Sequence, residues 1–342
     1  MVRTILKNAT AVGALLAILS IIPADVDAFQ NQASGKRSYH ARHESTLIDD
    51  GKDLIFPSVV HAEEYFSDPL AKLYLYTSPH RGAEIRLFLA DSIAGPWRLH
   101  GTVVGKEIGR NEHVSSPHAV WNPEEKELFL YVHAPNSQTI VCRSTDGINF
   151  DYRGLCVTKK MLSDVVGFES KSASYARVYR YRIPEYQNTW SMTLTASGKP
   201  DEMGLQKNAI VLCTSDDGVK WTVRRSLLDD GNSGQTYKSL DACWLPINGQ
   251  NFLVYARRSR QEEGQERTEP VRLHYSKGDE NWRNWNHQGV FYEPMRGYPD
   301  DGAARGVTVV DVGNEQILLY EAGQKNNARI AMLKLTEGAA PE

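Results

Sequence analysis

Residues 114–121 read VSSPHAVW, residues 127–132 read ELFLYV, and residues 141–150 read VCRSTDGINF. Each run is rich in apolar, β-branched or aromatic residues, and turn-forming residues separate the runs. Such runs are typical of short β-strands. The stretch therefore predicts a meander of three antiparallel strands.

The same three-part unit recurs four more times along the chain. The five copies start at Pro57, Pro117, Ala173, Leu240 and Ala304, which gives steps of 60, 56, 67 and 64 residues. A sustained period of this kind indicates a repeat architecture, in which each repeat is one supersecondary unit. The sequence predicts an all-β fold, a five-bladed β-propeller of four-stranded antiparallel blades.

The start of the chain has the pattern of a secretory signal peptide over residues 1–28. Lys7 precedes an apolar run at 9–22, and Val26-Asp27-Ala28 offers small residues for cleavage. The run is short for a membrane span, although a retained signal anchor stays an alternative. No other stretch of the sequence is apolar enough to cross a membrane. We expect a mature protein that starts after Ala28, is secreted or periplasmic, and has no membrane attachment.

Residues 29–54 are polar and carry no sustained period, so we expect an N-terminal arm across the propeller surface or a linker. Residues 55–336 hold the five repeats, and residues 337–342 form a C-terminal tail. The formal net charge is −3. A balance so close to neutral gives no indication of nucleic acid or an anionic membrane as a partner.

Four cysteines occur in a chain that is expected to meet an oxidising compartment. Cys142 and Cys156 fall on the third and fourth strands of one predicted blade, which favours a disulfide between them and a second between Cys213 and Cys243. Buried free thiols are the alternative. No cysteine spacing here matches a zinc site.

Two segments share a Ser-x-Asp-Gly pattern that ends on an aromatic residue: STDGINF at 144–150 and SDDGVKW at 215–221. Asp-Gly between β-runs predicts a tight turn, because Gly takes positive φ at no steric cost and Asp accepts hydrogen bonds from the turn amides. The segments resemble the Asp-boxes of sialidases, which recur in many secreted sugar-cleaving propellers. We interpret them as structural turns.

The repeat region resembles the five-bladed glycosidase clan that includes glycoside hydrolase families 43 and 117. The similar motifs are FPSVV at 56–60 followed by LYLY at 73–76, ADSIAGPW at 90–97, and the turn at 144–150. The resemblance implies a secreted carbohydrate-active protein. It describes the scaffold better than the chemistry, because one fold hosts many functions.

The catalytic carboxylates of that clan are not matched in this sequence. Where family 43 has the general base in the first blade, this chain has Phe56, and where the second blade carries an Asp it has His118. The third blade has Ser172 or Ser174 in place of an Asp. In the fourth blade Leu240 stands at the position of the catalytic Glu, with Asp241 one place later.

Polar residues stand near the start of each repeat, at Ser58, His118, Ser174, Asp241 and Arg305. The innermost strand of a propeller blade lines the central axis. An apolar core between blades would not require such a ring. We expect these side chains to face the axis, where they bind substrate or hold water or an ion. No metal ligands are assigned, and an axial calcium ion is left open.

The ends of the second strands should reach the same face, because they run antiparallel to the first strands. The residues at these ends are mostly cationic: His80, Arg81, His133, Lys199, Arg257 and Arg258, with Glu321 in the last repeat. Arg and Lys make charge-assisted hydrogen bonds to carboxylate or sulfate. Such a rim suits an anionic sugar, although any one of these arginines could simply solvate a loop.

Asp241 and His118 are the candidate catalytic residues, since each opens an inner strand whose apolar neighbours call for no titratable group. Glu169, just before the third repeat, is the candidate second carboxylate, with a solvated loop glutamate as the alternative. The candidate substrate-binding residues are Arg305, Arg258, Arg257, Ser58, Ser174, His133 and Glu321.

Three functions stay open at this point. The first is an inverting glycoside hydrolase for a plant or algal-type poly- or oligosaccharide, in which two carboxylates flank the scissile bond. The second is a polysaccharide lyase, in which arginine neutralises a uronate and His118 or Tyr175 takes the C5 proton. The third is a carbohydrate-binding propeller without catalysis. The resemblance favours the hydrolase.

Overall fold

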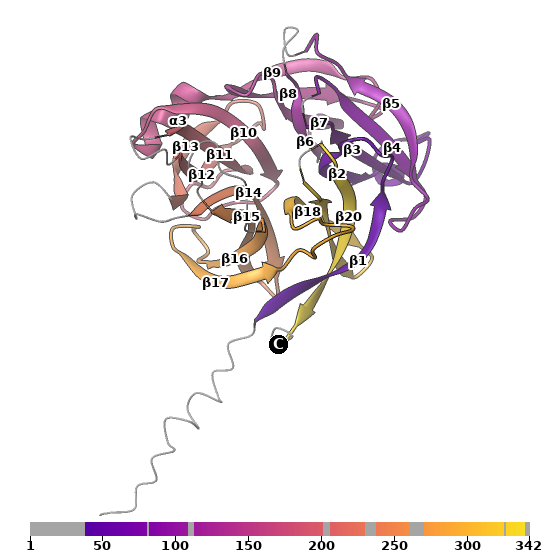
Figure 1. Ribbon diagram of the computed structural model, residues 1–342. Helices are drawn as coiled ribbons and strands as arrows, with labels where there is room; N and C mark the ends of the chain where they lie inside the picture. The colour runs from indigo at the N-terminus through magenta and orange to yellow at the C-terminus, as the bar shows by residue number, and fades with distance from the viewer. Residues whose placement is uncertain are drawn as a thin grey trace, which may run out of the picture. The chain divides into compact units, whose positions relative to one another are not determined.

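The computed structural model describes residues 38–80, 82–108, 113–200, 206–229, 237–259, 270–324 and 326–338. From Tyr39 onward the chain forms one compact unit. It consists of five four-stranded antiparallel sheets, arranged as blades around an axis (Figure 1). The predicted five-bladed propeller is confirmed. The expected signal peptide, residues 1–28, lies outside the described residues, as does Arg81.

Each of the first four blades is a meander of consecutive strands that starts at the axis. Blade I comprises β2 (Ile55–His61), β3 (Leu73–Ser78), β4 (Ile85–Ala90) and β5 (Arg98–Val104); blade II comprises β6 (Ser115–Asn122), β7 (Glu127–His133), β8 (Gln138–Ser144) and β9 (Asp151–Thr158); blade III comprises β10 (Ser170–Tyr179), β11 (Trp190–Pro200), β12 (Gln206–Ser215) and β13 (Thr222–Asp229); blade IV comprises β14 (Tyr237–Ile247), β15 (Gln250–Ser259), β16 (Arg272–Gly278) and β17 (Trp285–Tyr292).

Blade V is built from both ends of the propeller. β18 (Ala304–Val312), β19 (Glu315–Ala322) and β20 (Arg329–Glu337) follow one another, and β1 (Tyr39–Ile48) pairs antiparallel with β20 as the outermost strand. Figure 1 shows indigo β1 beside yellow β20. Part of the segment expected to be an arm or linker is therefore a strand, because the edge of β20 offers backbone groups that need hydrogen-bond partners.

Burial decreases from the inner strands to the outer ones. β7 is buried at every residue after its first, whereas the outermost strand β9 exposes most of its first half. Consecutive β7 residues face different blades: Leu130 packs with Tyr74 of blade I, and Phe129 packs with Trp190 of blade III. A strand covered on both faces is encoded as a continuous apolar run, and β7 carries such a run.

The first Ser-x-Asp-Gly turn is structural. The Asp146 carboxylate accepts hydrogen bonds from the amides of Ile148 and Asn149, both at 2.8 Å, and Gly147 has a φ of 72°. The Gly147 carbonyl accepts the hydroxyl of Tyr76, from blade I, at 2.7 Å. The turn therefore links blade II to the blade before it.

The second turn repeats this arrangement one blade further along. Asp217 accepts from the amides of Val219 and Lys220 at 2.8 Å, and the Gly218 carbonyl accepts the Tyr131 hydroxyl of blade II at 2.7 Å. Both turns join third to fourth strands, at the end of the propeller where the inner strands finish. We call this the lower end, and the end where the inner strands start the upper end. The prediction of structural turns is confirmed.

All four cysteines are buried free thiols, so the predicted disulfide between Cys142 and Cys156 is wrong. Cys142 packs in the cluster between blades I and II, and Cys156 in the cluster between blades II and III. The two side chains therefore project from opposite faces of one sheet. Cys213 and Cys243 likewise belong to different clusters.

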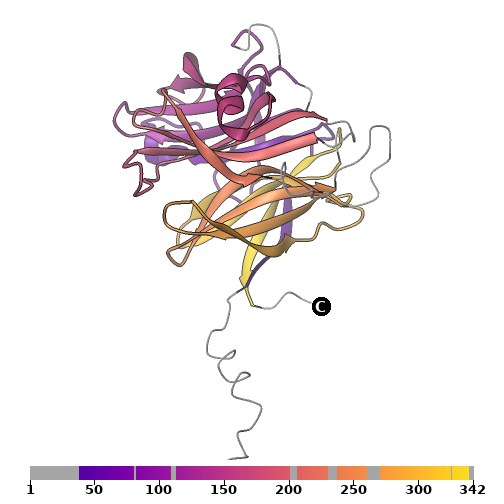
Figure 2. The same cartoon turned by 90° about the vertical axis from the view of Figure 1, so that its left-hand side faces the viewer.

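Two helices lie within the described ranges: α2 (Ala62–Tyr65) and α3 (Lys159–Val166). α3 begins at Thr158, whose side chain accepts the Met161 amide at 3.3 Å, and ends at Gly167 in the left-handed conformation. It packs against β10 and β13 of blade III and is seen in front of the strands in Figure 2. In the part of the chain that the structure describes, no helix is long and apolar enough to cross a membrane.

Candidate functional site

The five inner strands share one distortion near the upper end. Each places a single residue there with φ between 54° and 62°, namely Phe56 at 54°, Ser116 at 56°, Tyr175 at 62°, Asp241 at 57° and Gly306 at 59°. At each of these residues the pairing with the second strand shifts register, as in a β-bulge. Left-handed backbone is strained for residues other than glycine, and such strain concentrates at functional sites.

These bulges define two levels along the axis. The upper layer consists of the bulge residues, and the lower layer consists of the residues two positions later: Ser58, His118, Arg177, Cys243 and Thr308. The ring expected from the sequence is therefore divided. Asp241 is a bulge residue, Ser58 and His118 lie in the lower layer, and Ser174 and Arg305 come one position before their bulges.

The guanidinium of Arg177, from blade III, meets the four other blades. Nη1 donates to the Pro117 carbonyl of blade II at 3.3 Å, and Nη2 donates to the Gly306 carbonyl of blade V at 3.0 Å. The guanidinium carbon lies 5.7 Å from the ring centroid of Phe56 in blade I. Its charge also lowers the pKa of Asp241 in blade IV. Arg177 is 1% exposed, so a fixed cation occupies the axis at the level of the bulges.

Asp241 is a buried carboxylate whose Oδ1 has no hydrogen-bond partner. Its amide donates to Thr195 Oγ1 at 3.2 Å, which helps to hold the bulge. Burial raises the pKa of Asp241 to about 6, and the charges of Arg177, Arg305 and Arg258 oppose this rise. A carboxylate that is ionised at neutral pH but poorly solvated is suited to general base catalysis.

Glu321 is a second buried carboxylate at the same end. It lies opposite Arg305 in the pairing of β18 with β19, and Arg305 Nη2 is 2.5 Å from Glu321 Oε1. Burial raises the pKa of Glu321 to about 7; the Arg305 charge lowers it and the Asp241 charge raises it further. Arg305 Nη2 also donates to the Gly323 carbonyl at 3.2 Å.

Tyr175 shows that these charges meet in one place. Burial raises the pKa of its hydroxyl most, and the charges of Asp241 and Glu321 add to the rise while those of Arg258 and Arg305 oppose it. The Tyr175 ring stacks on Phe56 with centroids 4.9 Å apart. We call Tyr175, Arg177, Asp241, Arg258, Arg305 and Glu321 the axial cluster.

His133 borders the axial cluster through Tyr175, with ring centroids 5.7 Å apart. It is 3% exposed, and neither ring nitrogen has a hydrogen-bond partner. Burial first, and then the neighbouring His113, lowers the pKa of His133 to about 3. The ring is therefore neutral at physiological pH, and it stays buried beside the axial cluster.

The lower layer lines a separate cavity of about 220 Å³ at the lower end. There His118 Nδ1 accepts the Val178 amide at 3.1 Å, which places the proton of the neutral ring on Nε2. Burial, and then the Arg177 charge, lowers the pKa of His118 well below its ordinary value. Ser58 Oγ accepts the Ala119 amide at 2.9 Å. His118 and Asp241 thus stand on two levels of the axis, and the charge of Arg177 lowers the pKa of both.

Two other predicted residues stand apart from the axial cluster. The Glu169 side chain is 71% exposed and ion-paired with Lys171, which lowers its pKa, and no interaction of the described residues joins it to Asp241. The guanidinium of Arg257 packs on the ring of Tyr237 at 4.8 Å. Ser174 is buried beside the cluster, opposite Thr195 in the sheet.

A calcium ion at the axis does not fit these residues. Within the described ranges, no group of three or more His, Cys, Asp or Glu side chains could hold a metal ion. The axial position next to Asp241 already carries the Arg177 guanidinium. A second cation there would meet a buried like charge, which is strongly unfavourable at short distance.

Arg177 is the residue that sequence reasoning missed. It stands in YARVY at 175–179, where a lone cation interrupts the apolar residues Ala176 and Val178 of an inner strand. An arginine among apolar residues of an inner strand could have indicated a site residue, because arginine is rarely buried without a specific partner.

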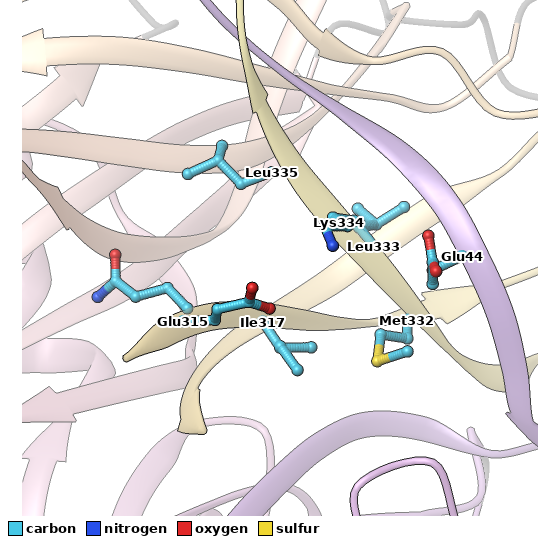
Figure 3. Close-up of a pocket in the computed structure, with 8 residues that line it drawn as sticks. Glu44, Glu315, Ile317, Met332, Leu333, Lys334 and Leu335 are labelled. Carbon is cyan, nitrogen blue, oxygen red and sulfur yellow. The ribbon is translucent and has the colours of Figure 1, made fainter. Parts of the chain in front are cut away.

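A further hollow of about 350 Å³ lies on the lower half of blade V, away from the axial cluster. Its apolar lining residues are Ile317, Met332, Leu333 and Leu335. Its polar or charged lining residues are Glu44, Glu315, Gln316 and Lys334 (Figure 3). It contains no member of the upper layer.

No protein-family model and no curated protein matches the sequence. Solved structures do match. A glycoside hydrolase aligns with a TM-score of 0.61 at 12% identity, over 88% of this chain and 92% of its own. A family 43 β-xylosidase/α-arabinofuranosidase from a compost microbial metagenome, solved with xylotriose, aligns with a TM-score of 0.55 at 15% identity, over 89% and 96%. An endo-arabinase from Bacteroides thetaiotaomicron aligns with a TM-score of 0.54 at 12% identity, over 87% and 99%.

The fold is that of the five-bladed glycoside hydrolases. The resemblance stated from the sequence motifs is thereby confirmed at the level of the scaffold. At 12–15% identity the alignments carry the fold alone. The chemistry of this chain has to be argued from its own axial cluster.

Proposed function

We propose that this protein is an exported glycoside hydrolase that binds an anionic poly- or oligosaccharide of plant or algal type at the axial cluster. One observation carries the proposal: Asp241 and Glu321 are both buried, both have raised pKa values, and both lie among arginines at the upper end. A pair of carboxyl groups, one acting as acid and the other as base, is the usual machinery of inverting glycoside hydrolysis.

In this proposal the two carboxylates divide the roles of general acid and general base between them. Glu321, with a pKa near 7, donates its proton to the leaving-group oxygen as the glycosidic bond breaks. Asp241, with a pKa near 6, accepts a proton from the water that attacks the anomeric carbon. In this proposal Glu321 takes the part that sequence reasoning gave to Glu169, because Glu169 is exposed and paired with a lysine.

The charge around Asp241 supports an anionic substrate. Arg177, Arg258 and Arg305 all act on this one carboxylate. Guanidinium groups bind carboxylate and sulfate by charge-assisted hydrogen bonds, and such bonds are strongest where water is excluded. We therefore expect acidic oligosaccharides to be turned over in preference to neutral ones of equal length.

The test compares Asp241→Asn and Glu321→Gln with wild type on a panel of neutral and acidic oligosaccharides. Each substitution keeps the shape and removes the titrating group, so turnover should fall by roughly 100-fold or more, the usual contribution of a positioned acid or base. Glu169→Gln is the matched control and should keep wild-type turnover, since its side chain is 71% exposed. Wild-type rates in both buried variants would refute the assignment.

The same incubations test the other two functions. A lyase would release an unsaturated uronate that absorbs in the ultraviolet, and a binding protein would retain the saccharide without turnover. The two bases that the sequence suggested for a lyase fit the role poorly, because His118 Nδ1 accepts a backbone amide in the lower layer and burial raises the pKa of Tyr175. We therefore rank the lyase below the hydrolase.

A further inference from the structure

An exposed aromatic ring stands on the upper end of blade V. Tyr298 lies between β17 and β18 and is 63% exposed, more than any other large hydrophobic side chain of the described residues. Met295, from the same connection, is 41% exposed. Single exposed hydrophobic side chains are common on protein surfaces, so the contacts that hold Tyr298 in place decide whether it could serve as a binding surface.

The connection that carries Tyr298 is held firmly from below. Asp300 is fully buried and its carboxylate accepts three hydrogen bonds: from the Tyr292 hydroxyl at 2.5 Å, the Tyr320 hydroxyl at 2.6 Å and the Met295 amide at 2.8 Å. These bonds fix the connection on both sides of Tyr298. The ring is presented on a preorganised support.

One face of the Tyr298 ring is covered by Arg329. The guanidinium carbon of Arg329 lies 4.8 Å from the ring centroid. Arg329 is itself held by Asp49 at 3.1 Å, by Asp301 at 3.3 Å, and by the Pro299 carbonyl. The cation–π contact fixes the plane of the ring.

Tyr298 and the axial cluster share the upper end of blade V. Arg329 pairs with Ala322 across β19 and β20, next to Glu321, which in turn lies opposite Arg305 on the inner strand. Two strand spacings separate β18 from β20, a distance of about 10 Å. Such a distance exceeds the width of a single pyranose ring. A ligand that reaches both places must contain more than one sugar.

We propose that Tyr298 is a stacking platform that binds a sugar ring of the saccharide outside the axial cluster. This inference rests on the proposed function for its ligand class. One face of a pyranose presents C–H groups, which pack on the π face of an aromatic ring and release water from both. Because Tyr298 is held by Arg329 and Asp300 before the ligand arrives, little conformational entropy is lost on binding.

The experiment measures saccharide affinity by titration calorimetry in the Asp241→Asn background, in which hydrolysis does not consume the ligand. The probes are an acidic monosaccharide and acidic oligosaccharides of increasing length. Tyr298→Ala should weaken oligosaccharide binding about three- to tenfold and leave monosaccharide binding unchanged. Tyr298→Phe keeps the ring and should keep the affinity. Tyr152→Ala is the matched control, since Tyr152 is 54% exposed on the outer strand β9 of blade II.

Unchanged oligosaccharide affinity in Tyr298→Ala overturns the platform, as does an equal loss in Tyr152→Ala. The result is separable from that of the proposed function. Wild-type protein without turnover, but with the Tyr298-dependent affinity for longer saccharides, removes the hydrolase and keeps the platform. No binding of any saccharide by the Asp241→Asn protein or the wild type overturns both.

Discussion

The upper and lower ends of the axis both hold buried titratable groups, but these are acids at one end and a histidine at the other. The upper end holds Asp241 and Glu321, 3% and 1% exposed, with pKa values raised by burial. The lower layer holds Ser58 and His118, 1% and 7% exposed, and His118 stays neutral because burial lowers its pKa. Burial favours the uncharged form of any titratable group, so the same physics moves acids and bases in opposite directions.

The position of an axial residue, at the bulge or two residues beyond it, thus decides which groups surround its side chain. A shift of two residues separates a carboxylate among arginines from a histidine that accepts a backbone amide. The Arg177 guanidinium, which reaches from the lower layer to the carbonyl of the bulge residue Gly306, influences the pKa of both Asp241 and His118. Substitution of Arg177 should therefore affect the residues at both ends of the axis, and substitution of Asp241, Glu321 or His118 should affect one end alone.

The largest effect is expected from Arg177→Met, which removes the cation between the layers. The carbonyls of Pro117 and Gly306 would each lose a buried donor, at a cost of about 1–3 kcal/mol of unfolding free energy per carbonyl. The pKa of Asp241 should rise further, because Arg177 lowers it in the wild type. Urea denaturation and the pH dependence of turnover measure the two effects.

Arg180→Met is the control for this change. Arg180 comes directly after the same strand, β10, and pairs with Glu124, whose side chain is 60% exposed. Exposed ion pairs contribute little to stability, so this variant should unfold nearly as the wild type does. An equal loss of unfolding free energy in both variants would show that the buried contacts of Arg177 stabilise the protein no more than an exposed ion pair does.

The next effect is a pH dependence of stability with opposite signs in the two layers. The pKa of Asp241 rises from 3.8 to about 6 and that of Glu321 from 4.5 to about 7. The folded state thus keeps protons that the unfolded chain releases. The stability present below about pH 4 is lost as pH rises through the folded pKa values, by an amount on the order of 3 kcal/mol for each group.

His118 has the reverse dependence, because its folded pKa lies below the ordinary value of 6.5. Its contribution is present above pH 6.5 and is lost as pH falls below that value. His133, with a pKa near 3, acts in the same direction. Urea denaturation from pH 4 to 8 measures the sum of these contributions, and the decrease in stability toward high pH that the carboxylates cause should be smaller in Asp241→Asn and Glu321→Gln than in wild type. A slope identical in all three proteins contradicts the raised carboxylate pKa values.

The smallest effect is expected from His118→Leu. The Val178 amide would lose its acceptor in a buried place, at a cost of about 1–3 kcal/mol of unfolding free energy. Turnover should stay at the wild-type level once folding is allowed for, because His118 lies in the lower layer. A loss of turnover as large as that of Asp241→Asn would instead return His118 to the catalytic machinery, where the sequence pattern had placed it.

The repeat pattern predicted the propeller because strands that are buried between blades must be apolar along their whole length, as β7 is. Asp241 could be singled out for a related reason, since a carboxylate beside apolar residues needs an explanation. Sequence alignment of the five repeats, however, paired Asp241 with Ser58 and His118, which stand two positions beyond their own bulges. A bulge adds one residue to a strand, and the five bulge residues share no residue type that would reveal it in the sequence.

Glu321 illustrates what the strand pattern left out. It was expected only to bind substrate, because it ends a second strand and the pattern gives no distance to Asp241. Its place beside Arg305 follows from the cross-strand register, and its raised pKa follows from burial. Glu169, which precedes an inner strand in the sequence, pairs with Lys171 at the surface instead.

The sequence by itself determined the number of blades, the two Ser-x-Asp-Gly turns and the presence of titratable groups near the inner strands, because these depend on local periodicity and turn chemistry. Only the tertiary structure decided which strand closes blade V, which faces the cysteines occupy, and which charges meet at the axis. The physical reason is that burial and electrostatic interaction depend on distances between residues far apart in the chain. Arg177, Asp241 and Glu321 come from three blades, and only closure of the propeller brings them together.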